Sequence, residues 1–153
     1  MDDIDSKILH LLQRDASLSV TEIAERINLS TTPCWRRIQN LEKSGVIKNR
    51  VALLDRAKVN LGITVFVRLK TARHDAAWLE SFAQKLDGMD EVQEFYRMSG
   101  DVDYLLKVVA PDIAGFDAFY KRLIDVPGLT DVSSNFAMEE IKYTTALPLH
   151  YAT

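Results

Sequence analysis

The chain has 153 residues, of which 47% are hydrophobic, and a formal net charge of −3 at pH 7. This length fits one domain or two small ones, and the apolar content is ample for a packed core. No run of 18 or more apolar residues occurs, and the acidic N-terminus MDDIDSK does not resemble a secretory signal, so we expect a soluble, cytoplasmic protein. The single cysteine, Cys34, excludes an internal disulfide and a cysteine-based metal cluster, and is expected to be a core residue.

The charge is unevenly distributed along the chain. Residues 1–60 contain 10 Lys and Arg against 8 Asp and Glu, whereas residues 61–153 contain 9 against 14. Between Arg26 and Lys58, 8 basic residues are opposed only by Glu42 and Asp55, which is a local net charge of +6. Screening limits charge interactions to about 8–10 Å at ordinary salt, so affinity for a polyanion depends on such a local patch. The pattern favours a DNA contact in the N-terminal part and a separate function in the acidic remainder.

The first 45 residues predict three helices that share one apolar face. Asp3 or Asp5 begins the first helix, which ends near Asp15, and Thr21-Glu22 begins the second. Only three or four residues connect the second helix to the third, which forces the sharp angle of a helix-turn-helix. The expected core of this unit contains Ile4, Ile8, Leu11, Ile23, Ile27, Leu29, Ile38, Leu41 and Val46.

The third helix lies within residues 29–47, LSTTPCWRRIQNLEKSGVI. Hydroxyl side chains at 30–32 can cap its start, Pro33 fits its first turn, and Gly45 supplies the stop. One apolar stripe at i, i+4 and i+7 is expected to face the core, formed by Cys34, Ile38 and Leu41.

The opposite face of this helix has few acids and many groups able to bond phosphates or base edges. A helix of this width fits the major groove, and its N-terminal residues reach base edges. Arg36 can contact guanine with two hydrogen bonds, whereas Arg37 either contacts phosphate or pairs with an acid of the first two helices. An ordinary solvated face is the alternative, which the short turn and the local charge of +6 disfavour. The expected DNA-binding set is Ser30, Thr31, Thr32, Trp35, Arg36, Arg37, Gln39, Asn40 and Lys43.

Residues 46–62 form the expected joint between two domains. VIKNRVALL at 46–54 has strand character, and Asp55 to Gly62 has the pattern of a short helical turn that ends at glycine. A strand between domains has no sheet of its own, so pairing with the same strand of a second chain would satisfy its backbone and predicts a dimer. The expected division is a helix-turn-helix domain at 1–45, a hinge strand and linker at 46–62, and a C-terminal domain at 63–153.

The C-terminal part alternates strand and helix patterns in the order βαββαβ. The expected strands are 63–70, 92–99, 104–110 and 132–143, and the expected helices are 75–86 and 111–124. This order predicts an α+β, ferredoxin-like domain with an antiparallel sheet and both helices on one side. We expect the uncovered sheet face to carry Phe66, Phe95 and Phe136 and to pack against a second copy, which would also supply a second recognition helix.

The turn between the two middle strands is a second candidate site. Gly100 lets backbone N–H groups approach an anion, and Asp101 and Asp103 can bind an ammonium group, so the turn suits a free amino acid. The alternative is a plain β-turn with solvated aspartates. If the fold brings the last strand near, its polar residues join the site, so the expected effector-binding set is Ser99, Gly100, Asp101, Val102, Asp103, Tyr104, Ser133, Ser134 and Asn135.

The sequence contains no recognisable set of catalytic residues. Its three histidines, His10, His74 and His150, lie on different expected elements, and no nucleophile–base pair or metal-ligand spacing occurs. We therefore expect no enzyme activity, no cofactor and no metal. Two alternatives to an effector-gated regulator stay open, namely an architectural DNA-binding oligomer without effector response and a ferredoxin-like enzyme that uses Asp101 and Asp103 as acid and base.

Several motifs in order resemble the Lrp/AsnC (leucine-responsive/asparagine-type, feast/famine) family of transcriptional regulators. They are DxxDxxIL at 2–9, the helix at 29–47, GDVDYLL at 100–106, and the end from PGL at 127–129 to EEIK at 139–142. The resemblance implies a winged or plain helix-turn-helix, a hinge strand, a ferredoxin-like effector domain, dimers, and an octamer of dimers. It also implies an amino-acid effector bound between dimers near Gly100–Tyr104, with Ser133–Asn135 as neighbours.

Finer details of the sequence narrow the resemblance. TTPCW, VALLD and SSNFAMEEIKYTTALP are most similar to a cysteine-responsive branch of the family. Relatives often have threonines where this chain has Ser133 and Ser134, which leaves the identity of the ligand open. Cysteine or a leucine-like amino acid is the expected effector, and double-stranded DNA and further copies of the chain are the expected partners.

Overall fold

The computed structural model of the chain describes residues 1–152, which divide into two compact units. One unit contains Met1–Leu53 together with the C-terminal residues from Ile141 onward, and the other contains Leu54–Glu140. The expected C-terminal domain at 63–153 therefore differs from the observed unit, because the last residues pack with the N-terminal helices. No helix in the described part of the chain is both long and apolar enough to cross a membrane.

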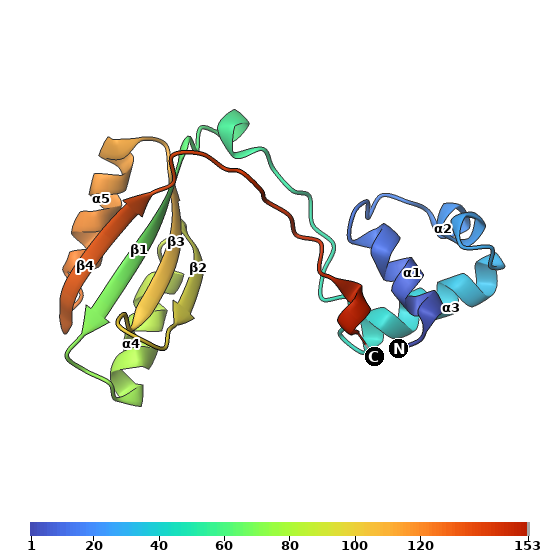
Figure 1. Cartoon of the computed structure of the whole chain (residues 1–153), viewed down its shortest axis with the longest axis horizontal. Helices are drawn as coiled ribbons and strands as arrows, with labels where there is room; N and C mark the ends of the chain where they lie inside the picture. The colour runs from blue at the N-terminus through green and yellow to red at the C-terminus, as the bar shows by residue number, and fades with distance from the viewer. Residues whose placement is uncertain (153) are drawn as a thin grey trace. The chain divides into compact units, whose positions relative to one another are not determined.

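Three short helices form the N-terminal unit: α1 (Asp3–Leu12), α2 (Val20–Arg26) and α3 (Thr31–Lys43) (Figure 1). Reciprocal capping begins the first two helices, with Asp2 and Asp5 at α1 and Ser19 and Glu22 at α2. Helix α2 thus begins one residue before the expected Thr21. Four residues separate α2 from α3, which confirms the expected short connection of a helix-turn-helix.

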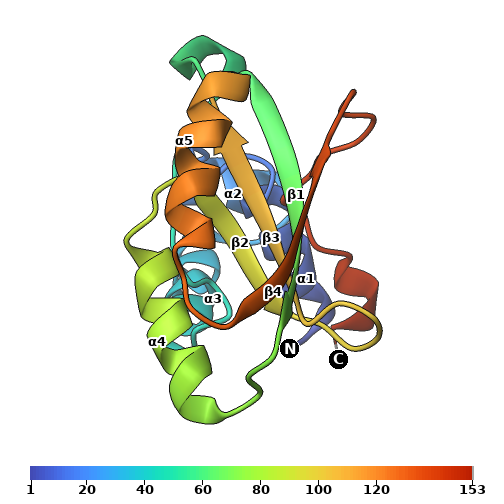
Figure 2. The same cartoon turned by 90° about the vertical axis from the view of Figure 1, so that its left-hand side faces the viewer.

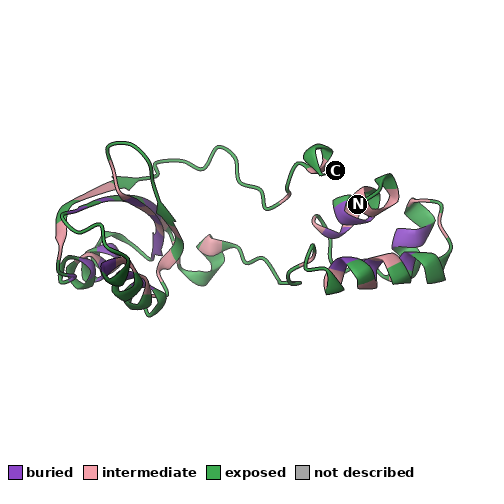
Figure 3. Cartoon of the chain, turned by 90° about the horizontal axis from the view of Figure 1, so that it is seen from below, coloured by how far each residue is buried: buried purple, intermediate pink, exposed green. Residues whose placement is uncertain are grey.

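The core of this unit is shared by all three helices. Its fully buried side chains include Ile8, Ile23 and Cys34, and Figure 3 shows the buried positions on the inner sides of the helices. The expected burial of Val46 was wrong, because its side chain is 51% exposed. The chain reverses at Gly45, which has a φ of 77°, and Ile47 packs against the core instead.

The C-terminal residues return to this helical unit. The side-chain amide of Gln13 donates a hydrogen bond to the carbonyl of Leu147 (3.0 Å) and accepts one from its N–H (2.8 Å). Leu149, in the 3-10 helix η2 (Leu149–Tyr151), is partly buried against the core of the three helices. The unit of three helices is thus completed by residues from the far end of the sequence.

The joint between the units lacks the expected strand. Residues 46–54 form no strand in the single chain, because no neighbouring strand offers them backbone partners. Val51, Leu53 and Leu54 are left 67%, 66% and 72% exposed. The expected short helical turn is confirmed as the 3-10 helix η1 (Arg56–Val59), although Asn60 rather than Gly62 adopts the left-handed conformation that ends it.

The second unit is a four-stranded antiparallel sheet covered on one face by two helices. Its strands lie in the order β2-β3-β1-β4, and Figures 1 and 2 show both helices on the same side of the sheet. This arrangement confirms the ferredoxin-like fold. The bounds are β1 (Ile63–Thr71), α4 (Ala76–Asp87), β2 (Val92–Arg97), β3 (Tyr104–Ala110), α5 (Ile113–Ile124) and β4 (Leu129–Phe136).

Strand β4 is shorter than expected and starts earlier. Its Phe136 lies opposite Val65, and the N–H of Ala137 makes a last bond to the carbonyl of Thr64. Strand β1 begins at Ile63, so the residues that follow Ala137 have no strand beside them. The expected continuation of the strand to residue 143 was therefore wrong.

Two of the three phenylalanines expected on the uncovered face lie on the helical side instead. The ring of Phe95 is 5.3 Å from that of Phe82 on α4, and the ring of Phe136 is 5.2 Å from that of Phe116 on α5. The register explains this, because both residues pair with inward-facing positions of the neighbouring strand. Only Phe66, which is 39% exposed, lies on the uncovered face as expected.

Candidate functional site

Helix α3 is anchored by one apolar stripe. Cys34, Ile38 and Leu41 are 0%, 2% and 5% exposed, which confirms the expected inward face. Burial raises the pKa of the Cys34 thiol, so the side chain stays neutral and behaves as a small core residue. Ser30 is the N-cap residue, but its hydroxyl makes no capping hydrogen bond and stays available to a ligand.

The outward face of α3 carries the residues expected to contact DNA. Trp35 is 51% exposed, an unusual position for an indole on a polar helix face. Arg36 and Lys43 form no ion pair within residues 1–152, whereas the amide of Gln39 donates to Glu42 (3.2 Å). The remaining exposed members of the set are Ser30, Thr31, Thr32 and Asn40.

Arg37 differs from the rest of the set. Its Nη1 atom lies 2.7 Å from Asp2 Oδ2 and 2.8 Å from Asp5 Oδ1, so its guanidinium is directed at α1. This is the pairing that the sequence left open as an alternative to a phosphate contact. The acid on the same helix, Glu42, is itself paired with Arg50 at 2.8 Å, so it does not cancel the exposed cations of α3.

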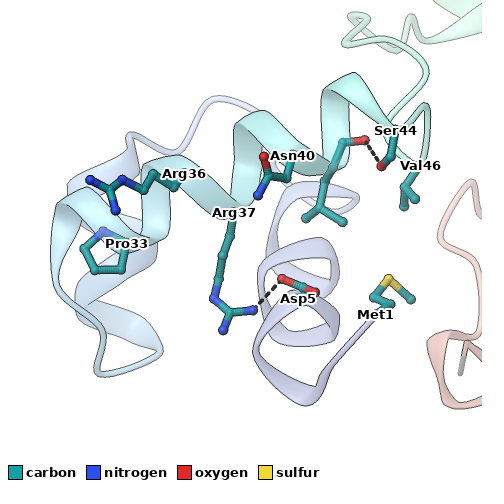
Figure 4. A pocket seen from close by; sticks show the side chains of 9 residues that line it. Met1, Asp5, Pro33, Arg36, Arg37, Asn40, Ser44 and Val46 are labelled. Atoms are coloured by element: carbon teal, nitrogen blue, oxygen red, sulfur yellow. Dashed lines mark hydrogen bonds and ion pairs between the residues drawn. The ribbon is translucent and has the colours of Figure 1, made fainter.

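A hollow of about 550 Å³ lies where α3 passes the start of α1. Arg36 and Arg37 both line it, and Figure 4 shows Arg37 directed toward Asp5 while Arg36 points along α3 in another direction. Pro33, Asn40 and Met1 also line the hollow. Of the two arginines that line the hollow, only Arg37 is paired with carboxylates within residues 1–152.

In the second unit, the loop between β2 and β3 is tied to the end of β1. The N–H of Asp103 bonds to the carbonyl of Leu69 (2.9 Å), and its carboxylate accepts the N–H of Thr71 (2.9 Å). The N–H of Met98 bonds to the Asp103 carbonyl (2.8 Å), and Gly100 has a φ of 104°. Asp103 is therefore partly committed to the structure of the loop, which the sequence did not indicate.

The structure brings only some of the expected effector-binding residues together. Asp101 contacts Arg68 of β1 at 3.4 Å, and Arg68 lies opposite Ser133 of β4, so these three share the uncovered side of the sheet. Asn135 lies opposite Phe66 on the same side, but Ser134 pairs with Val67, whose side chain faces the helices. Within one chain β1 separates β4 from β3, so the serines do not adjoin the loop.

A second hollow, of about 600 Å³, lies beside the loop. Ser99, Asp103 and Tyr104 line it together with two residues that were not predicted from the sequence, His74 and Arg97. The arginine close to the acidic turn was the available signal, because an amino-acid ligand carries a carboxylate as well as an ammonium group. Val102 does not line this hollow, and Tyr104 is only 4% exposed, with burial raising its pKa so that the phenol stays neutral.

The aromatic core fixes Tyr104 in place. Its ring centroid lies 5.8 Å from those of both Trp78 and Phe82. No group of three or more potential metal ligands occurs among the described residues. The arrangement offers charged and hydrogen-bonding groups for a small polar ligand.

Comparison with known protein families covers both units. Residues 1–48 match a family of winged helix-turn-helix DNA-binding domains, and residues 64–147 match the Lrp/AsnC ligand binding domain. The chain is 51% identical over 150 residues to the DNA-binding transcriptional activator DecR of Escherichia coli K12, covering 97% of this chain and 99% of that protein. It is 52% identical over 149 residues to a glutamate uptake regulatory protein of Zymomonas mobilis, covering 97% and 91%.

Two solved structures extend the comparison to the fold. An AsnC family transcriptional regulator from Agrobacterium tumefaciens superposes with a TM-score of 0.97 at 59% identity, covering 100% of both chains. The regulator NMB0573 of Neisseria meningitidis, solved as an L-Met complex, superposes with a TM-score of 0.95 at 36% identity, covering 100% and 99%. The relatives are regulators rather than enzymes, and this chain belongs to the Lrp/AsnC family of DNA-binding transcriptional regulators.

Proposed function

We propose that the chain regulates transcription by placing α3 in the major groove of double-stranded DNA. The observation that carries this proposal is the exposure of Trp35 and Arg36 on a helix whose other face is buried. Arg36 is free to make two hydrogen bonds to a guanine edge, and the methyl groups of Thr31 and Thr32 suit contact with thymine methyls.

The remaining polar residues of α3 suit the DNA backbone. Asn40 and Lys43 are exposed on the later turns of the helix, and Ser30 offers a free hydroxyl at its start. Gln39 can join them by exchanging its bond to Glu42 for a phosphate oxygen. Arg37 is not included among these phosphate contacts, because the carboxylates of Asp2 and Asp5 already bind its guanidinium.

Assembly of several copies completes the proposal. Val51, Leu53 and Leu54 in the joint are exposed and apolar, and their backbone lacks strand partners in one chain. Pairing of this segment between two chains would satisfy that backbone and supply two recognition helices for two half-sites. The dimer is proposed to assemble further into the octamer of dimers that the family resemblance implies.

The proposed effector is a free amino acid bound at the β2–β3 loop. Asp101 suits the ammonium group if it exchanges its contact with Arg68 for the ligand, and Arg97 beside the loop, which forms no ion pair within residues 1–152, suits the carboxylate. Because Ser133, Ser134 and Asn135 lie apart from the loop in one chain, they join the site only if a neighbouring protomer supplies them. The L-Met complex of NMB0573 supports an amino acid of this size, with cysteine and leucine-like side chains as candidates here.

Binding to DNA across a salt series tests the first part of the proposal. A DNA site is selected from a random pool with the wild-type protein, and its affinity should fall linearly with the logarithm of salt concentration. Arg36→Ala should relax sequence preference, whereas Lys43→Ala should weaken all sequences alike and reduce the slope by about 0.9. Lys121→Ala, which removes a cation from the other unit, is the matched control. Absent or salt-insensitive binding contradicts the proposal.

Thermal-shift screening of the twenty amino acids tests the effector. A ligand that binds only the folded state raises the melting temperature, and Asp101→Ala should abolish that rise. Asp90→Ala, which removes a similarly exposed carboxylate away from the loop, is the control. No response to any amino acid would favour an architectural protein without effector control.

A further inference from the structure

Arg37 forms a closed network with the start of α1. Its Nη1 atom bonds to Asp2 Oδ2 at 2.7 Å and to Asp5 Oδ1 at 2.8 Å. The remaining oxygens of the two carboxylates are also occupied, since Asp2 Oδ1 accepts the N–H of Asp5 (2.9 Å) and Asp5 Oδ2 accepts the N–H of Asp2 (3.2 Å). Each of the four carboxylate oxygens therefore has a partner.

The network joins α3, which is proposed to contact DNA, to α1, which is not. Asp2 and Asp5 cap the N-terminus of α1, while Arg37 follows Arg36 on the recognition helix. Figure 4 shows the Arg37 side chain extending from α3 across to Asp5, so a single side chain spans the gap between the helices. The hydrogen bond from the Asp5 N–H, followed by the one from Arg37, lowers the pKa of Asp2, so this carboxylate stays charged at neutral pH.

The charges and geometry of the network favour a role in orienting α3 over a role in stability or in attracting DNA. Both carboxylates lie close to the face that is proposed to meet a polyanion, and unpaired they would repel phosphates. Exposed ion pairs add little to stability, and here the Arg37 and Asp2 side chains are 31% and 54% exposed. The closed geometry restricts how α3 can rotate on α1, and a binding site must hold its groups within about 0.5 Å and 10–20°.

We propose that Arg37 is a positioning residue for DNA recognition, which acts by holding α3 on the capped start of α1 rather than by touching DNA. This inference rests on the proposed role of α3 as the DNA reader. It assigns Asp2 and Asp5 a part in sequence preference, although both are acidic residues beside a DNA-binding face. Removing their negative charges should weaken specific binding, against the direction that simple electrostatics predicts.

The experiment compares affinities of the folded full chain for the selected DNA site and for a scrambled site over a salt series. Arg37→Ala should lower affinity for the selected site about tenfold or more, with the affinity for scrambled DNA and the salt slope close to those of Arg14→Ala. Arg14 is an exposed cation outside α3 and without an ion pair in residues 1–152, so it controls for the loss of one charge. Circular dichroism at the assay temperature checks that each variant is folded.

Two further variants keep the test decisive if Arg37→Ala does not fold. Arg37→Lys should recover most of the specific affinity, because both bonds come from one nitrogen and an ammonium group can make both. The double variant Asp2→Asn and Asp5→Asn retains capping oxygens but removes both charges, and should lose specific affinity.

Three results would overturn this inference alone. A salt slope reduced by about 0.9 with equal weakening on both DNAs would make Arg37 a phosphate contact. Tighter binding by the double asparagine variant would reduce the carboxylates to a repulsive charge. Unchanged sequence preference in folded Arg37→Ala would leave the network a purely structural feature. Absence of DNA binding by the wild-type protein overturns the proposed function together with this inference.

Discussion

Replacement of Gly128 by alanine should destabilise the ferredoxin-like unit strongly. Gly128 has a φ of 92°, and a Cβ added there would lie 2.7 Å from Nε1 of Trp78. The same nitrogen donates a hydrogen bond to the carbonyl of Pro127 (2.8 Å), and the Gly128 carbonyl accepts from Thr71 Oγ1 (2.9 Å). The turn before β4 is thus packed directly against the indole.

Two contributions make up the expected loss of unfolding free energy. A left-handed backbone costs an alanine about 1–2 kcal/mol. Displacement of Trp78 from a packed core adds about 1–3 kcal/mol, and loss of its bond to Pro127 adds about 1 kcal/mol. Gly100→Ala isolates the first contribution, because its φ is 104° and no atom lies within 4 Å of the added Cβ. Gly128→Ala should therefore be less stable than Gly100→Ala by about 2–4 kcal/mol.

Tryptophan fluorescence measures this difference in the relevant unit. The chain has two tryptophans, so a Trp35→Phe background leaves Trp78 as the only indole reporter. For a domain of this size the melting temperature of Gly128→Ala should lie about 10–20 °C below that of Gly100→Ala. Melting of the two variants within about 2 °C of each other would refute the reasoning from the Trp78 contact.

Three further predictions concern contacts outside α3. Gln13→Ala should speed hydrogen exchange at the Leu147 N–H about fivefold to tenfold, since about 1 kcal/mol of bonding is lost; unchanged exchange would mean that the C-terminal residues do not dock there. Hydrogen bonds from the backbone N–H groups of Asp5 and Ser19 lower the pKa values of Asp2 and Glu22, respectively. The stabilisation from these two carboxylates is fully present above their ordinary pKa of about 4, and it is lost as the pH falls through their lowered pKa values. The melting temperature of the helical unit should therefore decrease toward about pH 2 rather than stay constant. Asp103→Ala should lower the melting temperature of the ferredoxin-like unit, because it frees the buried end of β1, whereas Asp101→Ala should leave it nearly unchanged; equal effects would contradict the assignment.

Periodicity predicted the features that depend on one element alone. Cys34, Ile38 and Leu41 share a face on any α-helix, so their burial could be read from their spacing. The order of strands and helices likewise predicted the ferredoxin-like sheet, because few topologies accommodate βαββαβ with short connections. For the same reason the connection between α2 and α3 indicated a helix-turn-helix.

Features that depend on register or on distant segments could not be predicted. Phe95 and Phe136 were assigned to the wrong sheet face, because the face follows from the pairing with β3 and β1, which local alternation does not reveal. The contact of Gln13 with Leu147 joins residues 134 positions apart, and neither residue type indicates it. The assignment of Val46 to the core was wrong, because the chain reverses at the left-handed Gly45 and Ile47 packs against the core instead.

The candidate sites show the same division. Most of the outward face of α3 was predicted from the sequence, although Arg37 and Gln39 are only partly exposed. The partner of Arg37 was one of two alternatives until the structure placed Asp2 and Asp5 beside it. At the β2–β3 loop, the spacing of the aspartates indicated a negatively charged turn but not which other residues lie beside it. Arg97 and His74 were therefore not predicted, because the fold brings them to the hollow from outside the turn.

Methylation interference at guanine N7 tests most directly whether α3 reads the major groove. N7 is one of the two guanine atoms that an arginine contacts there, and it does not face the minor groove. The wild-type protein should fail to bind selected DNA that is methylated at particular guanines of each half-site, and Arg36→Ala should lose that sensitivity. Binding that is indifferent to N7 methylation throughout the selected site would contradict a major-groove role for α3.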